Sequence, residues 1–180
     1  MKGNTRKITV IGMFCALAFA ATAIGRVPLV LFLKYDPKDS VIAVSGLIFG
    51  PLTSCTVAVI VSWLELFTLS ENGILGFLMN VISSCSFAGI SALVYKKRPT
   101  FPGAVIGLLC GWGCMVSVML LWNYLIAPVY MGCSREEVAK LLLPAFLPFN
   151  LIKGGANAAI TILLYKPVVV TLRRTGLSIK

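Results

Sequence analysis

The sequence predicts an all-α integral membrane protein with six transmembrane helices in a compact bundle, an outer lid loop and both termini in the cytoplasm. The first observation is composition: 58% of the 180 residues are hydrophobic, 12% are charged, and the mean hydropathy is +0.95, as in integral membrane proteins. The second is that no segment is polar enough for a separate soluble domain, so we expect residues 1–180 to form a single membrane domain. The third is that basic residues cluster at the ends of apolar segments. The net charge of +10 therefore does not indicate a nucleic-acid-binding face.

The first apolar segment, Ile8–Gly25, extends about 27 Å as a helix, close to the thickness of one hydrocarbon core. Small residues recur along one side of it at helical spacing, which permits close approach of another helix: Gly12, Ala16, Ala20 and Ala23. A basic start and small residues near Ala18–Ala20 also fit a cleavable signal peptide. The small-residue stripe favours a retained helix.

The segment Arg26–Asp39 is too long for a simple turn and mixes apolar residues with Pro28 and Pro37. Loops of this length are often functional lids. Asp39 or Ser40 can cap the helix that follows, and that helix is short because Gly50-Pro51 ends it.

The next two segments, Leu52–Leu69 and Ile74–Tyr95, each contain polar residues. Glu65 lies about one turn from the outer end of its segment, where it either reaches the interface or belongs to a site. Asn80 shares a helix face with Ser83 and Ser84, and such groups bind either neighbouring helices or a ligand.

The fifth segment starts near Pro102 and ends in an aromatic outer belt that contains Asn123. Its glycines at four-residue spacing predict a helix-packing seam: Gly103, Gly107 and Gly111. Ser134 followed by acidic residues predicts a helix N-terminus. Pro144 and Pro148 are expected to break that helix before the last segment begins.

The last segment places three polar side chains on one helical stripe, at Asn150, Lys153 and Asn157. A Lys at membrane depth costs about 2.5–3.5 kcal/mol, so it should face a cavity or a partner. No acidic residue lies within two helical turns of it in the sequence. The stripe indicates one of two things. Either the three side chains form a row of polar groups that bind a buried ligand (a polar rack), or the Lys extends to the interface and the two amides bond to neighbouring helices.

Six spans place both termini on one side, and the positive-inside rule makes that side cytoplasmic. With this orientation, ten basic residues lie at inner ends and five in outer loops. Asn123, Asn150, Lys153 and the lid loop then share the outer end.

The sequence lacks the residues that several kinds of functional site require. The chain has no His and no C-x-x-C motif, so we expect no metal site. It has no P-loop for ATP hydrolysis and no Ser/His or Cys/His pair for nucleophilic catalysis. We therefore expect no enzyme activity and no cofactor. Two amides and a Lys at the mouth of an apolar bundle fit a neutral, flat molecule with an imide or ureide edge.

Several motifs resemble the substrate-binding S components of energy-coupling factor (ECF) vitamin transporters, and specifically their riboflavin-specific type. The most specific are Phe32-Leu33-Lys34-Tyr35-Asp36-Pro37 and Phe149-Asn150-x-x-Lys153. Phe49-Gly50-Pro51 and Asn123-Tyr124, with the Pro128 and Tyr130 that follow, are also similar. The likeness covers nearly the whole chain and is weakest between Met131 and Leu147.

The resemblance implies a high-affinity riboflavin-binding subunit in a bacterial cell membrane. It implies that riboflavin is the transported ligand and that the first outer loop closes over it. The partners would be a shared transmembrane subunit, two cytoplasmic ATPase subunits and the lipid bilayer. Asn123, Asn150 and Lys153 would meet the isoalloxazine edge, and Asn80 is a further candidate from its helix face alone. Leu31 and Leu33 would cover the ring, Tyr35 and Asp36 would hold the closed turn, and the small-residue stripe from Gly12 to Ala23 would face the shared subunit.

Two other functions remain open from the residues. The ligand could be another vitamin or a phosphorylated flavin, with Lys34 or Lys38 meeting the phosphate. A stand-alone secondary transporter would favour inverted repeats and intramembrane ionisable relays. Only Glu65 and Lys153 could serve such a relay, and no internal repeat is visible.

Overall fold

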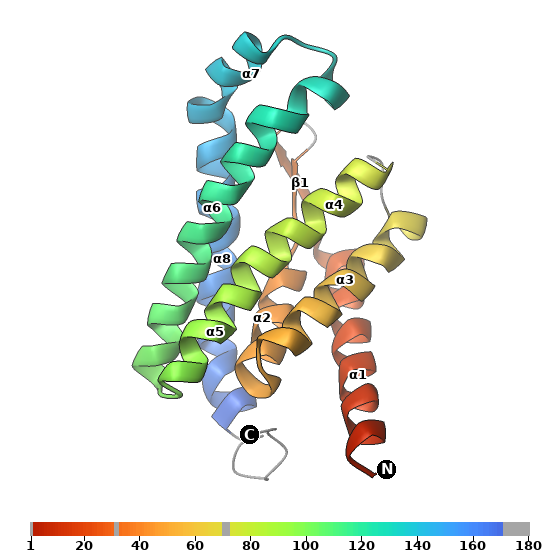
Figure 1. Ribbon diagram of the computed structural model, residues 1–180, viewed down its shortest axis with the longest axis vertical. Coiled ribbons are helices and arrows are strands. Elements are labelled where there is room, and N and C mark those ends of the chain that lie inside the picture. The colour runs from red at the N-terminus through yellow and green to blue at the C-terminus, as the bar shows by residue number, and fades with distance from the viewer. Residues whose placement is uncertain (1, 31–32, 70–72, 171–180) are drawn as a thin grey trace.

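The computed structural model describes residues 2–30, 33–69 and 73–170. The chain forms a helical bundle with one short β-hairpin (Figure 1). Its elements, in chain order, are α1 (Lys2–Gly25), β1 (Val27–Val30), β2 (Leu33–Tyr35), α2 (Lys38–Phe49), α3 (Pro51–Thr68), α4 (Gly73–Ser84), the π-helical segment η1 (Cys85–Gly89), α5 (Ile90–Lys97), α6 (Phe101–Met131), α7 (Arg135–Leu141), the π-helical segment η2 (Leu142–Phe146), α8 (Leu147–Leu164) and the π-helical segment η3 (Tyr165–Val170).

Five helical stretches among the described residues are long and apolar enough to cross a membrane: Ile8–Gly25, Pro51–Thr68, Gly73–Lys97, Phe101–Val129 and Arg135–Val168. The sixth expected span corresponds to α2, which has 12 residues and extends only about 18 Å. Helix α2 is nevertheless almost wholly buried. It lies at the centre of the bundle and, together with the hairpin before it, returns the chain toward the end at which α1 begins (Figure 1).

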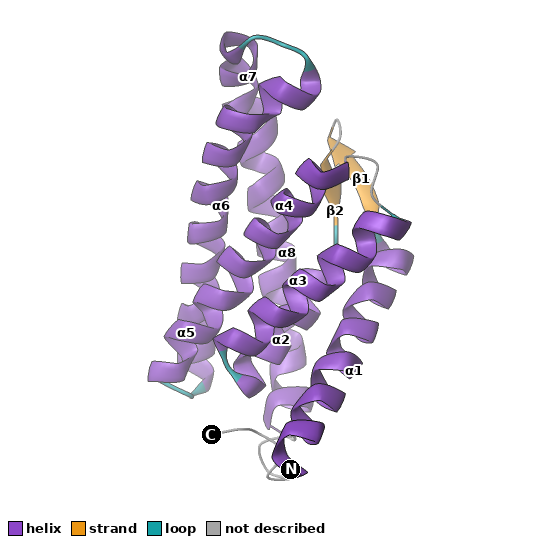
Figure 2. Cartoon of the chain, turned by 45° about the vertical axis from the view of Figure 1, so that its right-hand side comes forward, coloured by secondary structure: helices purple, strands orange, loops and turns teal. Residues whose placement is uncertain are grey.

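The segment expected to be a lid loop contains a two-stranded antiparallel hairpin. Val27 pairs with Tyr35 and Pro28 with Lys34, with an irregularity before the Val30–Leu33 pair. Figure 2 shows the hairpin at the end of the bundle away from the N-terminus, near the ends of α1, α3 and α4. The description all-α is thus correct for the bundle but omits this hairpin.

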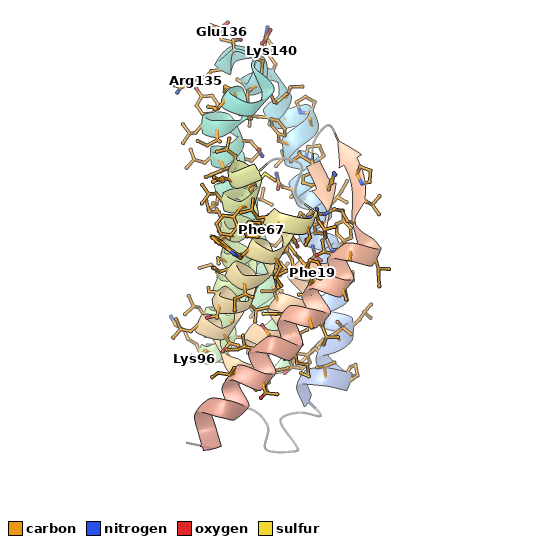
Figure 3. All side chains as sticks on the ribbon, turned by 90° about the vertical axis from the view of Figure 1, so that its right-hand side faces the viewer. Phe19, Phe67, Lys96, Arg135, Glu136 and Lys140 are labelled. Carbon is orange, nitrogen blue, oxygen red and sulfur yellow. The ribbon has the colours of Figure 1, made fainter. Side chains whose placement is uncertain are left out.

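The charged ends of the bundle are far apart. Figure 3 shows Arg135, Glu136 and Lys140 at one end and Lys96 near the other, with Phe19 and Phe67 between them. The start of α1 lies at the Lys96 end, as does the end of η3 (Figure 1). The first and last described elements therefore begin and end on the same side, as the six-span topology predicts.

Two local predictions are confirmed. A Cβ on Gly107 or Gly111 would lie 2.6 Å from the Ser91 carbonyl oxygen or 2.2 Å from the Ser91 hydroxyl, so this seam does pack α6 closely on its neighbour. Ser134 and Glu137 form a reciprocal capping box at the start of α7.

Two other local predictions are wrong. Pro144 and Pro148 do not break the chain's last helix, because Arg135–Val168 is helical throughout. The turn that contains Pro144 widens to the π-helical segment η2, an adjustment that keeps the helix going past residues without an N–H. Asp39 does not cap α2, since Pro37 occupies the N-cap position with no side-chain cap.

Candidate functional site

A pocket opens beneath the hairpin, between α3, α4, α6 and α8. Its wall combines apolar side chains with a concentrated set of polar and charged ones. The lining residues are Arg26, Leu33, Lys34, Asp36, Leu69, Gly76, Met79, Asn80, Ser83, Met119, Phe149, Asn150 and Lys153. The hairpin contributes Leu33 and Lys34 to this lining, and Asp36 follows directly after the hairpin.

The pocket is narrow in this structure. It encloses about 50 Å³. Small-molecule sites usually have volumes of roughly 300–1,000 Å³. The space in this structure is therefore smaller than that of a typical small-molecule site.

Lys153 lies on α8 with its side chain 7% exposed. Its ammonium is 3.3 Å from Asp39 Oδ2 and donates to Ser83 Oγ at 3.4 Å. The next residue, Gly154, allows α6 to approach, because a Cβ there would lie 2.2 Å from Trp112 Cδ1. The acid missing near Lys153 in the sequence is thus supplied by α2, and the Lys faces the pocket.

Asn150 lies one turn before Lys153 on the same wall. Its side-chain amide donates to the Phe146 carbonyl oxygen at 2.8 Å. That bond directs the amide along its own helix and fixes its rotamer at the pocket.

A buried ion cluster joins the hairpin to α1, α2 and α3. Arg26 Nε is 2.6 Å from Asp36 Oδ1, and Arg26 Nη2 is 3.2 Å from Glu65 Oε2. Lys38 is fully buried, with its ammonium 2.5 Å from the same Glu65 oxygen and 3.8 Å from Asp36. Glu65 is therefore the central member of the cluster, and its role is not that of a snorkelling side chain.

Neutral donors complete the surroundings of Glu65. Thr22 on α1 donates to Oε1 at 3.1 Å, and Asn80 on α4 donates to Oε2 at 3.0 Å. Buried carboxylates remain ionised only when they are paired and hydrogen-bonded. The cluster thus connects the hairpin with four helices, α1, α2, α3 and α4, around the pocket.

The ionisation of Asp36 reflects this environment. Burial opposes the charged form, but the positive charges of Lys38, Lys153 and Arg26 outweigh it and hold the pKa of Asp36 below its usual value. For Arg26, burial acts to lower the pKa, and its hydrogen bond and attraction to Asp36 and Glu65 raise it overall. Both partners therefore stay charged at neutral pH.

Asn157, the third member of the predicted polar rack, does not line the pocket. Its side-chain oxygen accepts from Ser40 Oγ at 2.7 Å and from Tyr35 Oη at 3.4 Å, and its amide donates to the Asp36 carbonyl oxygen at 3.2 Å. Asn157 instead ties the end of the hairpin to α8.

The structure brings most, but not all, of the predicted site residues together. Five line the pocket: Leu33, Asp36, Asn80, Asn150 and Lys153. Tyr35 lies behind the wall, bonded to Asn157. Asn123 is fully buried on α6, one turn beyond the lining residue Met119, but does not itself line the pocket. Leu31 lies outside the described residues.

Sequence reasoning missed Arg26 and the apolar wall of Leu69, Met79, Met119 and Phe149, whereas Ser83 was left open beside Asn80. A signal for the ion cluster did exist. The chain has only six acidic residues. Three of them, Asp36, Asp39 and Glu65, lie in or beside apolar segments, and so do the basic residues Arg26, Lys38 and Lys153. For the apolar wall no such signal exists, since Met and Leu occur throughout the chain.

The small-residue stripe of α1 faces outward. Gly12, Ala16, Ala20 and Ala23 are exposed, whereas Phe14, Cys15, Ala18 and Thr22 on the opposite side are buried. A Cβ on Gly12 would meet no atom within 4 Å. The stripe is therefore not used in packing the described part of the bundle.

Among the described residues, no group of three His, Cys, Asp or Glu side chains is arranged to hold a metal ion. The acids near the pocket are instead paired with Arg26, Lys38 and Lys153.

Comparison with protein families places this arrangement in a known group. Residues 6–165 match the family model described as ECF transporter, substrate-specific component. The chain belongs to this family. The earlier resemblance to S components is thus confirmed at the level of the family, and the chain is a multi-pass membrane protein of a transport system, not an enzyme.

Two curated relatives have similar sequences. The riboflavin transporter RibU of Staphylococcus aureus (strain TCH60) is 28% identical over 97% of this chain and 95% of its own length. The riboflavin transporter FmnP of Bacillus subtilis (strain 168) is 30% identical over 84% of this chain and 85% of its own.

A solved structure supports the fold. The structure titled "Structure and mechanism of the S component of a bacterial ECF transporter" matches 94% of this chain and 98% of its own, with a TM-score of 0.79 and 24% identity. The helical arrangement is therefore that of an ECF S component.

Proposed function

We propose that this S component binds riboflavin at the pocket beneath the hairpin and delivers it to an ATP-driven ECF transporter for uptake. The observation that supports this most is the wall that Asn80, Asn150 and Lys153 form beside Met79, Met119 and Phe149. Polar and apolar side chains line the same slot, as a flat ring with one polar edge requires. The names of the two relatives agree with this ligand.

The polar groups match the isoalloxazine edge by type. An amide offers both a donor and an acceptor to an imide, and an ammonium offers donors to a carbonyl oxygen. Asn150 and Lys153 are one turn apart on α8, so both can reach one edge of a ring that lies against Phe149 and the methionines. Asn123 is buried on α6 one turn beyond Met119, and we propose that it meets the ring once the pocket widens.

The hairpin is proposed to be the lid. Leu33 is 2% exposed and packs with Phe146 and Phe149, so it closes the pocket from above. Asp36 and Tyr35 hold the base of the hairpin through Arg26 and Asn157. Opening requires these contacts to loosen, which accounts for the small volume enclosed in the closed form.

A phosphorylated flavin is the second candidate, because Lys34 lines the pocket and one relative is named FmnP. Lys38 does not support it, since its ammonium is buried against Glu65. The prediction that Lys38 meets a phosphate is therefore wrong. Of the two lysines, Lys34 is the one that can take that role.

The energising partners are proposed to dock on α1. The stripe from Gly12 to Ala23 is exposed and small, and close helix approach in lipid requires small side chains. It lies on the opposite side of α1 from Thr22, which contacts the ion cluster. We propose a shared transmembrane subunit here and two ATPase subunits on the cytoplasmic side, with both termini of this chain on that side.

Purified protein would test the ligand by quenching of the fluorescence of riboflavin and of its phosphate, with thiamine added as a competitor. We expect saturable binding of riboflavin that thiamine does not displace, and tighter binding of the phosphate would favour the second candidate. Uptake by vesicles with and without the energising subunits and ATP would test coupling. Equal uptake without ATP would contradict it and favour a stand-alone transporter.

A further inference from the structure

Asp39 sits behind the pocket and contacts it only through another residue. It is absent from the pocket wall, whereas its partner Lys153 and the neighbouring Ser83 line it. The Asp39 side chain is 2% exposed and the Lys153 side chain 7% exposed. The pair therefore forms a buried unit with only its ammonium end toward the ligand space.

Both oxygens of Asp39 are engaged, which fixes the carboxylate. Ser84 Oγ donates to Oδ1 at 2.5 Å, and Oδ2 lies 3.3 Å from the Lys153 ammonium. Asp39 also lies in the first turn of α2, where the helix dipole favours a negative charge. The position of the Lys153 ammonium is thus determined by a rigid acid on a different helix.

The other buried charges near the pocket pair among themselves. Arg26 and Lys38 contact Asp36 and Glu65, so this cluster has two positive and two negative charges. Within the described residues, Asp39 is the acid that forms an ion pair with Lys153. The charge of the Lys153 ammonium is therefore balanced by Asp39 where it faces the pocket. Asp39 and Ser83 use two of its three N–H donors.

We propose that Asp39 is a positioning residue for ligand recognition. It holds the Lys153 ammonium in place and neutralises it, so that the remaining donor binds a neutral carbonyl oxygen on the ligand ring. This inference rests on the proposed flavin-binding function and adds a residue that does not touch the ligand. It implies that Asp39 affects binding only while Lys153 is present.

A double-mutant cycle tests this dependence. The variants are Asp39→Asn, Lys153→Met and the double variant, each titrated with riboflavin by fluorescence quenching. We expect Asp39→Asn alone to weaken binding by about 10-fold or more, because a buried charge is left unpaired. In the Lys153→Met background we expect the same change to add less than about 3-fold, since linked residues are not additive. Equal losses in both backgrounds would overturn the proposal.

The absorption spectrum of the bound flavin gives a second readout that a purely structural role would not move. An ammonium without its counter-charge beside a ring carbonyl should shift the flavin bands in Asp39→Asn. The shift should vanish when Asp39→Asn is made in the Lys153→Met background. Identical spectra for wild type and Asp39→Asn would contradict the proposal.

Ser40→Ala is the matched control, because it removes a buried hydrogen bond from the adjacent residue of α2 to Asn157 on α8 without touching Lys153. The loss of riboflavin binding free energy in Ser40→Ala should add to the loss in Lys153→Met, because the two side chains are not linked.

If Asp39→Asn does not fold, thermal melting replaces the titration. The variant that combines Asp39→Asn with Lys153→Met should then regain a cooperative unfolding transition, because the unpaired ammonium has been removed. The proposal would be overturned if neither Asp39→Asn nor the double variant showed such a transition. If folded wild-type protein does not bind riboflavin, the proposed function itself is wrong. This outcome is distinct from failure of the Asp39 proposal, in which wild type binds and the variants do not show the expected coupling.

Discussion

The attachment of the hairpin to α8 through Asn157 yields the sharpest test of the lid. Replacing Asn157 with Ala removes three side-chain contacts, with Ser40 Oγ, Tyr35 Oη and the Asp36 carbonyl oxygen. Ser40 retains the Asn157 backbone oxygen at 3.2 Å, and Tyr35 is partly exposed, so both can find other partners. The Asp36 carbonyl is the group left buried without this donor.

The expected cost follows from these contacts. A buried hydrogen bond contributes a net of about 1 kcal/mol, and an unsatisfied buried group costs about 1–3 kcal/mol. We expect the closed hairpin to lose about 2–3 kcal/mol relative to the open one, which is roughly a 30- to 150-fold larger open fraction. A two-stranded hairpin is at best marginally stable alone, so its strands should lose protection when it detaches.

Amide hydrogen exchange over residues 27–35 measures this directly, without ligand. The Asn157→Ala variant should exchange there roughly 30- to 150-fold faster, while α5 and α6 remain unchanged. Thr161→Ala is the control, because Thr161 is buried one turn further along and its hydroxyl donates to the Asn157 backbone oxygen within the same helix. The reasoning is refuted if hairpin exchange is unaltered by Asn157→Ala, or if Thr161→Ala accelerates it equally.

Three further predictions address ligand, pH and partner. Lys153→Ala should weaken riboflavin binding roughly 10- to 150-fold, the value of a hydrogen bond to a charged group at about 1.5–3 kcal/mol; fluorescence titration with unchanged affinity would remove Lys153 from the site. Because the folded pKa of Asp36 is lowered, its stabilising contribution should be complete above about pH 4 and lost as the pH falls through the lower folded value. Thermal melting should show this acid loss in wild type and a weaker one in Asp36→Asn; the same profile in both would contradict it. Replacing Ala16 and Ala20 with Leu should leave riboflavin binding intact but prevent co-purification with the energising subunits. Loss of binding as well would indicate that the stripe packs within the bundle.

The sequence was most informative where a pattern is local. Hydrophobic runs located the long helices, the four-residue glycine spacing located the α5–α6 contact, and Ser134 with Glu137 located the capping box. The prediction at Pro144 failed because a π-helical turn absorbs a proline that a regular α-helix would not.

The site was predictable in part. Asn150 and Lys153 share a helix face, so their common position on the pocket wall follows from spacing alone. Asn157 shares that face too, yet it turns to the hairpin because Ser40 and Tyr35 come from elements distant in sequence. The same holds for the Asp39–Lys153 pair and for Glu65, whose partners are brought together only by tertiary packing.

The most direct test of the central claim is the binding of riboflavin by the purified chain alone. Fluorescence quenching should saturate at one riboflavin per chain, and the affinity should fall in both Asn150→Ala and Lys153→Ala while the melting transition persists. Absence of saturable quenching in folded wild-type protein, or full affinity in both variants, would contradict a flavin site in this pocket.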